Sequence, residues 1–103
     1  MTAYLMVRAE VSDPDLRPGF DAWYEREHLR DAVDGLGAVR AWRGWSRLQP
    51  AVHFAFYEFP DAASAQAALE CAAMTALKAE FDRAWGTRIV RTREVIEVAG
   101  SIP

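Results

Sequence analysis

The segment Phe20-Asp21-Ala22-Trp23-Tyr24-Glu25-Arg26-Glu27-His28-Leu29-Arg30-Asp31 places three aromatic side chains, a histidine and several carboxylates on about three turns of a predicted helix. Successive helical residues are rotated by about 100°, so Phe20, Tyr24 and His28 lie one above another on a single face. A parallel row beside them is formed by Trp23, Glu27 and Asp31. A helix that only covers a surface rarely carries this mixture, and the segment therefore predicts the wall of a pocket.

The length of the chain sets the number of domains. With 103 residues, the sequence predicts a single domain over residues 1–103, because a chain of this length is long enough for one hydrophobic core and too short for two. A hydrophobic fraction of 51% with 26% charged residues is typical of an ordinary folded protein. The formal net charge of -3 gives no reason to expect a nucleic-acid partner, because domains that bind nucleic acid usually have an excess of basic residues.

The number of cysteines and the N-terminal sequence indicate the cellular compartment in which the protein is expected. Cys71 is the single cysteine, so no intramolecular disulfide can form, and a reducing cytoplasm is the expected setting. A small apolar filler in an alanine-rich helix is the better interpretation of this residue than a reactive thiol. We find no signal-peptide pattern and no apolar run that approaches the ~20 residues of a membrane span, so we expect no membrane partner.

Hydrophobic periodicity predicts six elements. Short segments rich in β-branched and aromatic residues predict strands at residues 3–10, 38–48, 51–59 and 87–98. Helices are expected at about residues 18–33, which Gly35 and Gly37 would close, and at about 62–72, with a break near Met74 and Thr75. After that break, a buried helical stripe is predicted at Leu77, Phe81, Ala84 and Trp85, ending at Gly86.

The order strand, helix, strand, strand, helix, strand predicts an α+β fold of the ferredoxin-like βαββαβ type. Its four-stranded antiparallel sheet would carry the two helices on one face. The strands at 3–10 and 51–59 are apolar on both faces, and two helices can cover only one of them. The simplest cover for the second face is another copy of the same sheet, so we expect a symmetric homodimer with its sheets face to face.

These residues also carry a family resemblance. The pattern Phe20-x-x-Trp23-Tyr24-x-x-x-His28-Leu29, followed by a glycine turn and the strand sequence Arg-Ala-Trp-Arg at residues 40–43, resembles the EthD-like branch of the dimeric α/β-barrel superfamily. Leu36-Gly37 replaces the usual Pro-Gly. The resemblance implies a dimeric barrel with a small-molecule cavity between sheet and helices. Relatives of this kind include cofactor-free monooxygenases, polyketide cyclases, lactone isomerases and haem-degrading enzymes.

His28 and Tyr24 are the candidate catalytic residues. Histidine titrates near neutral pH and can act as a general base or acid, and Tyr24 lies one turn before it, where it could orient the ring or share its ligand. The alternative is a structural histidine that binds a backbone group or a carboxylate and holds the fold or the dimer together.

Candidate ligand-binding residues come from the aromatic content and from the second histidine. Four tryptophans in 103 residues suit an apolar pocket for a planar ligand, although each aromatic taken alone is more often core. The candidates are Trp23, Phe20, Glu27, Tyr4, Trp42 and His53. Glu27 could equally be solvated or ion-paired, and His53 could be a satisfied interface histidine. Two histidines without a Cys/His cluster predict no metal site.

The function favoured by the sequence is a cofactor-independent enzyme that performs acid/base or oxygen chemistry on a hydrophobic or aromatic small molecule. One alternative is a non-catalytic small-molecule-binding or accessory protein with the same cavity. A second is a haem-binding or haem-degrading protein, which would need a histidine facing the cavity. No nucleotide or serine-hydrolase motif is present.

Overall fold

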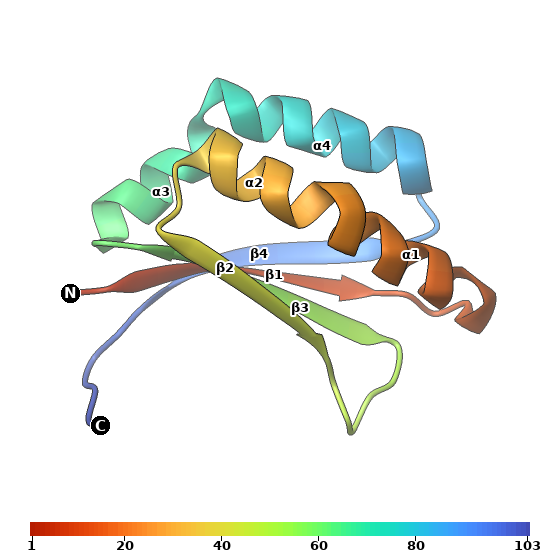
Figure 1. The fold of residues 1–103 in the computed structure, drawn as a ribbon, viewed down its shortest axis with the longest axis horizontal. Helices are drawn as coiled ribbons and strands as arrows, with labels where there is room; N and C mark the ends of the chain where they lie inside the picture. The colour runs from red at the N-terminus through yellow and green to blue at the C-terminus, as the bar shows by residue number, and fades with distance from the viewer.

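A computed structural model describes residues 1–103 and contains a four-stranded antiparallel sheet with all helices on one face (Figure 1). The strand order in the sheet is β2-β3-β1-β4, so β2 and β4 are the edges. The strands are β1 (Ala3–Glu10), β2 (Arg40–Trp45), β3 (Val52–Phe59) and β4 (Val90–Glu97). This arrangement confirms the predicted ferredoxin-like fold, with strand ends that differ from the predicted ones by up to three residues.

The first helical region runs without a break from residue 17 to residue 36, after a short 3-10 turn, η1 (Pro14–Leu16). It consists of α1 (Arg17–Trp23), a π-helical turn η2 (Tyr24–His28) and α2 (Leu29–Leu36). The helix ends at Gly37, whose φ of 73° lies in the left-handed region that glycine adopts without a steric penalty. The predicted helix is confirmed, and its end lies three residues beyond the predicted one.

The second helical region is divided into α3 (Ala62–Glu70) and α4 (Ala72–Trp85). The break was predicted near Met74 and Thr75, but it lies at Cys71, whose ψ of 162° is extended. Met74 instead belongs to the buried face of α4, which explains why the chain remains helical there. None of the helices is both long enough and apolar enough to cross a membrane.

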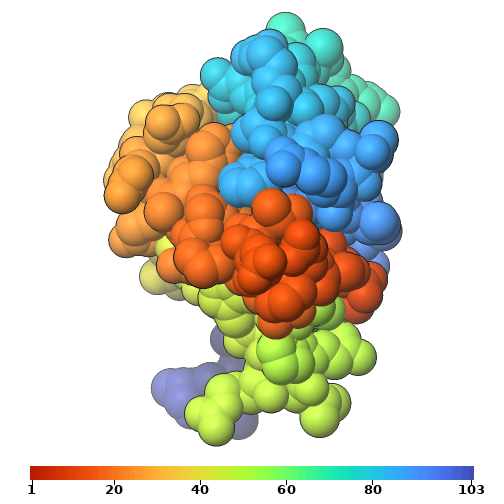
Figure 2. Space-filling model, turned by 90° about the vertical axis from the view of Figure 1, so that its right-hand side faces the viewer, coloured from red at the N-terminus to blue at the C-terminus, as the bar shows by residue number.

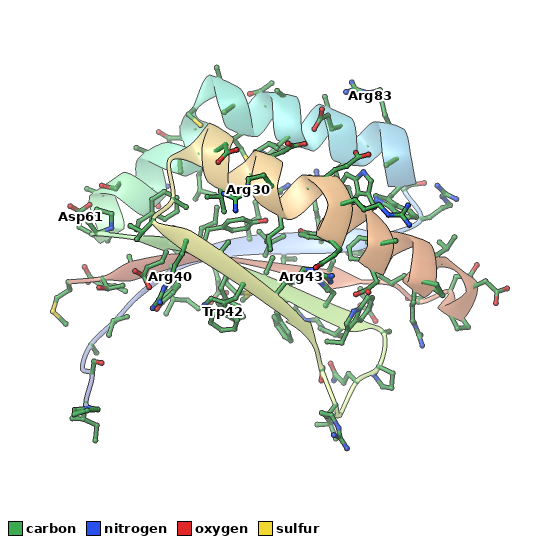
Figure 3. All side chains as sticks on the ribbon, in the orientation of Figure 1. Arg30, Arg40, Trp42, Arg43, Asp61 and Arg83 are labelled. Atoms are coloured by element: carbon green, nitrogen blue, oxygen red, sulfur yellow. The ribbon has the colours of Figure 1, made fainter.

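The two faces of the sheet have different environments. Alternate residues of β1 point toward the helices and are buried, namely Ala3, Leu5, Val7 and Ala9. The other face carries no helix (Figure 1). Figure 3 shows this alternation on β2, where Trp42 points away from the helices and Arg43 points toward them. The Trp42 ring is half exposed and stacks on Phe56 of β3 with a centroid distance of 4.1 Å.

The pairing of β2 with β3 is regular across Gly44. Trp42 pairs with Phe56 and Trp45 pairs with His53, so no bulge interrupts the ladder. The two tryptophans therefore point to opposite faces, as the odd spacing between them predicts.

The packing of α4 confirms the predicted apolar stripe, because Leu77, Phe81 and Trp85 are all buried against the sheet and the first helix. The two helices approach closely at Gly35, where an added Cβ would lie 3.3 Å from the Cβ of Ala73. At the opposite end, the start of α1 and the end of α4 lie against each other, and the tip of the β2–β3 hairpin projects below them (Figure 2). The helices and the sheet thus form two tightly packed layers.

Candidate functional site

A cavity lies between the two layers, and its wall combines apolar side chains with a small group of titratable ones. Leucine, valine, alanine, methionine and phenylalanine side chains from β1, α2 and α4 form most of the lining. The titratable side chains are Tyr24, His28, Tyr57, Arg91 and Arg93. The side chains that line the cavity leave room for about one water molecule. A larger ligand must therefore displace flexible side chains such as Met74.

The π-helical turn decides which residues surround His28. The backbone N–H of Leu29 donates to the carbonyl of Tyr24, five residues back, instead of to the carbonyl four residues back. In a regular helix, Trp23 and His28 would be about 140° apart. Here their rings stack at 4.3 Å with an interplanar angle of 17°, while Tyr24 meets the imidazole edge-on at 4.9 Å. The turn thus brings His28 into contact with both aromatic rings, which also contact each other.

The imidazole of His28 is 8% exposed, and its Nδ1 atom is buried without a hydrogen-bond partner. Burial, with a further contribution from the positive charges of Arg91 and Arg93, lowers the pKa of His28 to about 4. The ring is therefore neutral at pH 7. The ring lines the cavity, and a neutral imidazole with an unpartnered ring nitrogen can accept a proton or donate a hydrogen bond to a ligand.

Tyr24 and Tyr57 supply buried phenol groups beside His28. Burial raises the pKa of Tyr24 to about 12, although the neighbouring Tyr57 and the nearby arginines act in the opposite direction. Burial also raises the pKa of Tyr57 well above its ordinary value. Both phenols therefore keep their protons at neutral pH and can donate hydrogen bonds.

Arg91 and Arg93 were not among the residues predicted from the sequence. They are two residues apart on β4, and their side chains share the face that looks toward the helices. Arg91 lies 3.7 Å above the Phe81 ring and 3.6 Å from the carboxylate of Asp82. The available signal was the i, i+2 spacing of the two arginines, which puts them on one face of a strand, but a face with arginines is ordinarily interpreted as solvent-exposed.

His28 also borders a second hollow, a groove on the outer surface between the first helix and α4. The groove is lined by Trp23, Glu27, His28, Asp31, Glu80, Arg83 and Ala84. The row of Trp23, Glu27 and Asp31 derived from helical spacing therefore lies together at this groove. Glu27 faces the outer groove and not the inner cavity.

Phe20 and His53 lie behind Tyr24 and do not line the cavity. Phe20 is fully buried, with its ring centroid 5.2 Å from that of Tyr24, and the His53 ring lies 4.6 Å from the same tyrosine. Arg43 donates to Asp21 at 2.8 Å and approaches Nε2 of His53 at 3.4 Å. Phe20 and His53, which were predicted to bind the ligand, therefore pack against Tyr24 and hold it in place.

Tyr4 and Trp42 require a correction, because both lie on the face of the sheet that carries no helix. Each sits at an even-numbered position of a strand whose odd-numbered residues point toward the helices, so neither side chain can reach the cavity. The hydroxyl of Tyr4 instead donates to Glu58 at 3.1 Å, and Glu58 also pairs with Arg40 at 3.0 Å.

The two buried histidines predict a loss of stability in mild acid. Burial lowers the pKa of both His28 and His53 to about 4, whereas an unfolded histidine titrates near 6.5. Between these values the unfolded chain binds more protons than the folded chain, so the stabilisation is complete above about pH 6.5 and is lost as the pH falls toward 4. We expect the free energy of unfolding, measured with urea, to fall by on the order of 1–2 kcal/mol between pH 6.5 and 5.5. A constant value over this range would contradict the buried neutral histidines.

Comparison with solved structures identifies proteins of the same fold. An ethyl tert-butyl ether degradation (EthD) family protein from Bacillus halodurans aligns with a TM-score of 0.72 and 17% identity over 95% of this chain and 99% of that one. HapK from Hahella chejuensis aligns with a TM-score of 0.70 and 18% identity, covering 98% and 96% of the two chains. SnoaB, a cofactor-independent oxygenase from Streptomyces nogalater, aligns with a TM-score of 0.66 and 16% identity over 99% and 97%.

These matches confirm the fold that the family resemblance implied, that of EthD-like and related monooxygenase-type ferredoxin-like proteins. No protein-family model matches the sequence, and no curated protein sequence does. At such low sequence identity, the structural similarity shows the fold and not the reaction.

Proposed function

We propose that this chain is a cofactor-independent enzyme that transfers protons to and from a hydrophobic or aromatic small molecule in the cavity, with His28 as the general base. The observation that carries the proposal is the buried, unpartnered Nδ1 of His28, in a ring that lines an otherwise apolar cavity. An orphaned polar atom of this kind costs stability unless a ligand satisfies it. A neutral imidazole there can take a proton from an acidic C–H or a phenolic O–H group.

Tyr24 is assigned the complementary role. Removal of a proton beside a carbonyl places negative charge on the carbonyl oxygen, and a protonated phenol can donate a hydrogen bond to it. The raised pKa of Tyr24 keeps that phenol protonated at neutral pH. Return of the proton to another atom gives isomerisation or cyclisation, whereas reaction of the carbanion with O₂ gives oxygenation. The name of SnoaB as a cofactor-independent oxygenase supports including the second outcome.

The proposal is tested by incubating the purified protein with planar carbonyl compounds and quinols, and by measuring products and oxygen consumption without added cofactor. We expect product from at least one compound in this class. Saturable binding without product from any of them would overturn the enzyme assignment and favour an accessory binding protein. Haemin is added separately, and a shifted Soret band would favour the haem alternative.

We further propose that the protein is a homodimer that pairs the uncovered sheet faces. Trp42 on one edge strand and Val90 and Ile96 on the other are 50%, 65% and 38% exposed on that face, and such apolar groups favour burial. Because the two sheet faces would be identical, a twofold arrangement can bury both at once. An interface of about 800 Å² per subunit would be of ordinary stable size.

Light scattering at micromolar concentration should therefore give twice the chain mass of 11.6 kDa. The Trp42→Glu variant should shift the protein toward the monomer, because each interface would then bury two unpaired carboxylates. Arg30→Glu, on the exposed side of α2, is the matched control and should remain dimeric. A monomeric unmodified protein would refute the dimer.

A further inference from the structure

The cavity contains an excess of positive charge in a protein whose net charge is -3. Arg91 and Arg93 both line it, and the carboxylate that pairs with Arg91 is that of Asp82, at 3.6 Å. That carboxylate is 68% exposed and lies outside the cavity lining. One carboxylate therefore serves two neighbouring guanidinium groups, which repel each other.

Arg93 has no partner of its own. Its guanidinium makes no hydrogen bond and no ion pair, although the side chain is half buried. Burying a cation without a counter-charge of its own is unfavourable, and the carboxylate whose charge reaches Arg93, that of Asp82, is already paired with Arg91. By contrast, Arg43 on the opposite edge strand is bound to both Asp21 and Glu25, at 2.8 and 3.0 Å. Of the arginines without a hydrogen bond or an ion pair, Arg93 is thus the one that is partly buried and lines the cavity.

The other polar groups of the cavity are also hydrogen-bond donors or can become donors. His28, with 92% of its surface buried, has a free Nδ1 atom, and the phenols of Tyr24 and Tyr57 are buried beside it. No carboxylate lines the cavity. A guanidinium presents a planar set of N–H donors that matches the two oxygens of a carboxylate. The remaining wall is apolar and suits a hydrocarbon or aromatic body.

We propose that the cavity selects organic anions, with Arg93 binding a carboxylate or a similar delocalised oxygen anion of the ligand and the apolar wall receiving its hydrophobic body. This inference rests on the proposed function in taking the cavity as the ligand site, and it adds the charge of the ligand. Arg91 contributes a second positive charge and, through its contact with Phe81, fixes the edge of the site.

The experiment compares charged ligands with uncharged ligands of the same shape. Benzoate and 2-naphthoate are titrated against benzamide and 2-naphthamide by calorimetry, with the N–H signals of the arginine side chains followed by NMR. We expect at least one carboxylate to bind at least tenfold more tightly than its amide, and its addition to shift the Arg93 signal. Arg93→Gln should remove that preference, while Arg30→Gln, which changes the net charge equally on an exposed helix face, should retain it.

Each other result has a defined meaning. Equal affinity for acid and amide, binding of neither pair, or an Arg93→Gln variant that keeps the preference would overturn the anion site. Retention of the folded state is checked by thermal melting, and Arg93→Met repeats the test with the apolar stem preserved. Selective anion binding together with the absence of any turnover would sustain this inference and refute the proposed enzyme. Turnover of neutral substrates that is equal in Arg93→Gln and Arg30→Gln would sustain the proposed enzyme and refute the anion site.

Discussion

Replacing Phe81 by alanine should lower the free energy of unfolding by about 3–5 kcal/mol. The side chain is 2% exposed, and its ring packs against Phe20 and Trp23 with centroid distances of 6.1 and 5.6 Å. It also lies beneath the guanidinium of Arg91. Truncation would leave a void beside an existing cavity and would remove that cation–π contact, so the surroundings cannot easily collapse to fill the space.

Urea unfolding at pH 7 measures this loss, with all variants compared at one protein concentration because association adds to apparent stability. Phe81→Leu keeps much of the volume and should cost less than about 1.5 kcal/mol. Lys78→Ala, on the exposed side of the same helix, should change stability by no more than about 0.5 kcal/mol. A loss under 1 kcal/mol for Phe81→Ala would show that the stripe on α4 does not support the core.

The fold was predictable because its main signals are local and repeat along the chain. The residue types at 3–10 predict a strand, the stripe at Leu77, Phe81 and Trp85 predicts a buried helix face, and the structure confirms both. The positions of Gly37 and Gly86 predicted where the two long helical regions end, and both glycines adopt positive φ values there. The break at Cys71 was misplaced because an alanine-rich sequence has uniformly high helix propensity and carries little information about an interruption.

The candidate site was predictable only in part. Helical spacing predicts that Tyr24 and His28 lie on the same face of the helix, and their rings are in contact in the structure. The stacking of Trp23 on His28 could not be derived, because it depends on a π-helical turn and a 3.6-residue period places the two side chains apart. Whether a turn is α or π depends on tertiary packing, which sequence spacing does not report.

The sheet residues show the same limit more strongly. Aromatic identity suggested Tyr4 and Trp42, but the strand period assigns them to the face opposite the cavity once the helix-facing side is known. Conversely, Arg91 and Arg93 have the polarity of a solvent face, yet they point toward the helices from an edge strand. Polarity predicts the exposure of most side chains correctly, and it fails for these two cations, which lie on the helix-covered side of the sheet.

Removing the base at position 28 should produce the largest functional effect. In His28→Gln we expect kcat for a substrate identified by product screening to fall by about 10²–10⁴-fold, the usual contribution of a positioned general base. Glutamine retains a polar side chain of similar reach but cannot accept a proton at neutral pH. Since the proposed role is in chemistry and not in binding alone, KM should change much less than kcat. Arg30→Ala, on the exposed face of α2, is the control and should keep full activity.

A structural role for His28 makes a different claim, and a second variant separates the two. His28→Phe preserves an aromatic ring in contact with Trp23 and Tyr24 and removes both ring nitrogens, so it should melt near the temperature of the unmodified protein while losing activity. If stacking were the whole role of the residue, His28→Phe would be active and His28→Gln would be unstable. Full activity in a folded His28→Gln protein would remove His28 from the mechanism and leave Tyr24 and the cavity arginines as the groups that act on the ligand.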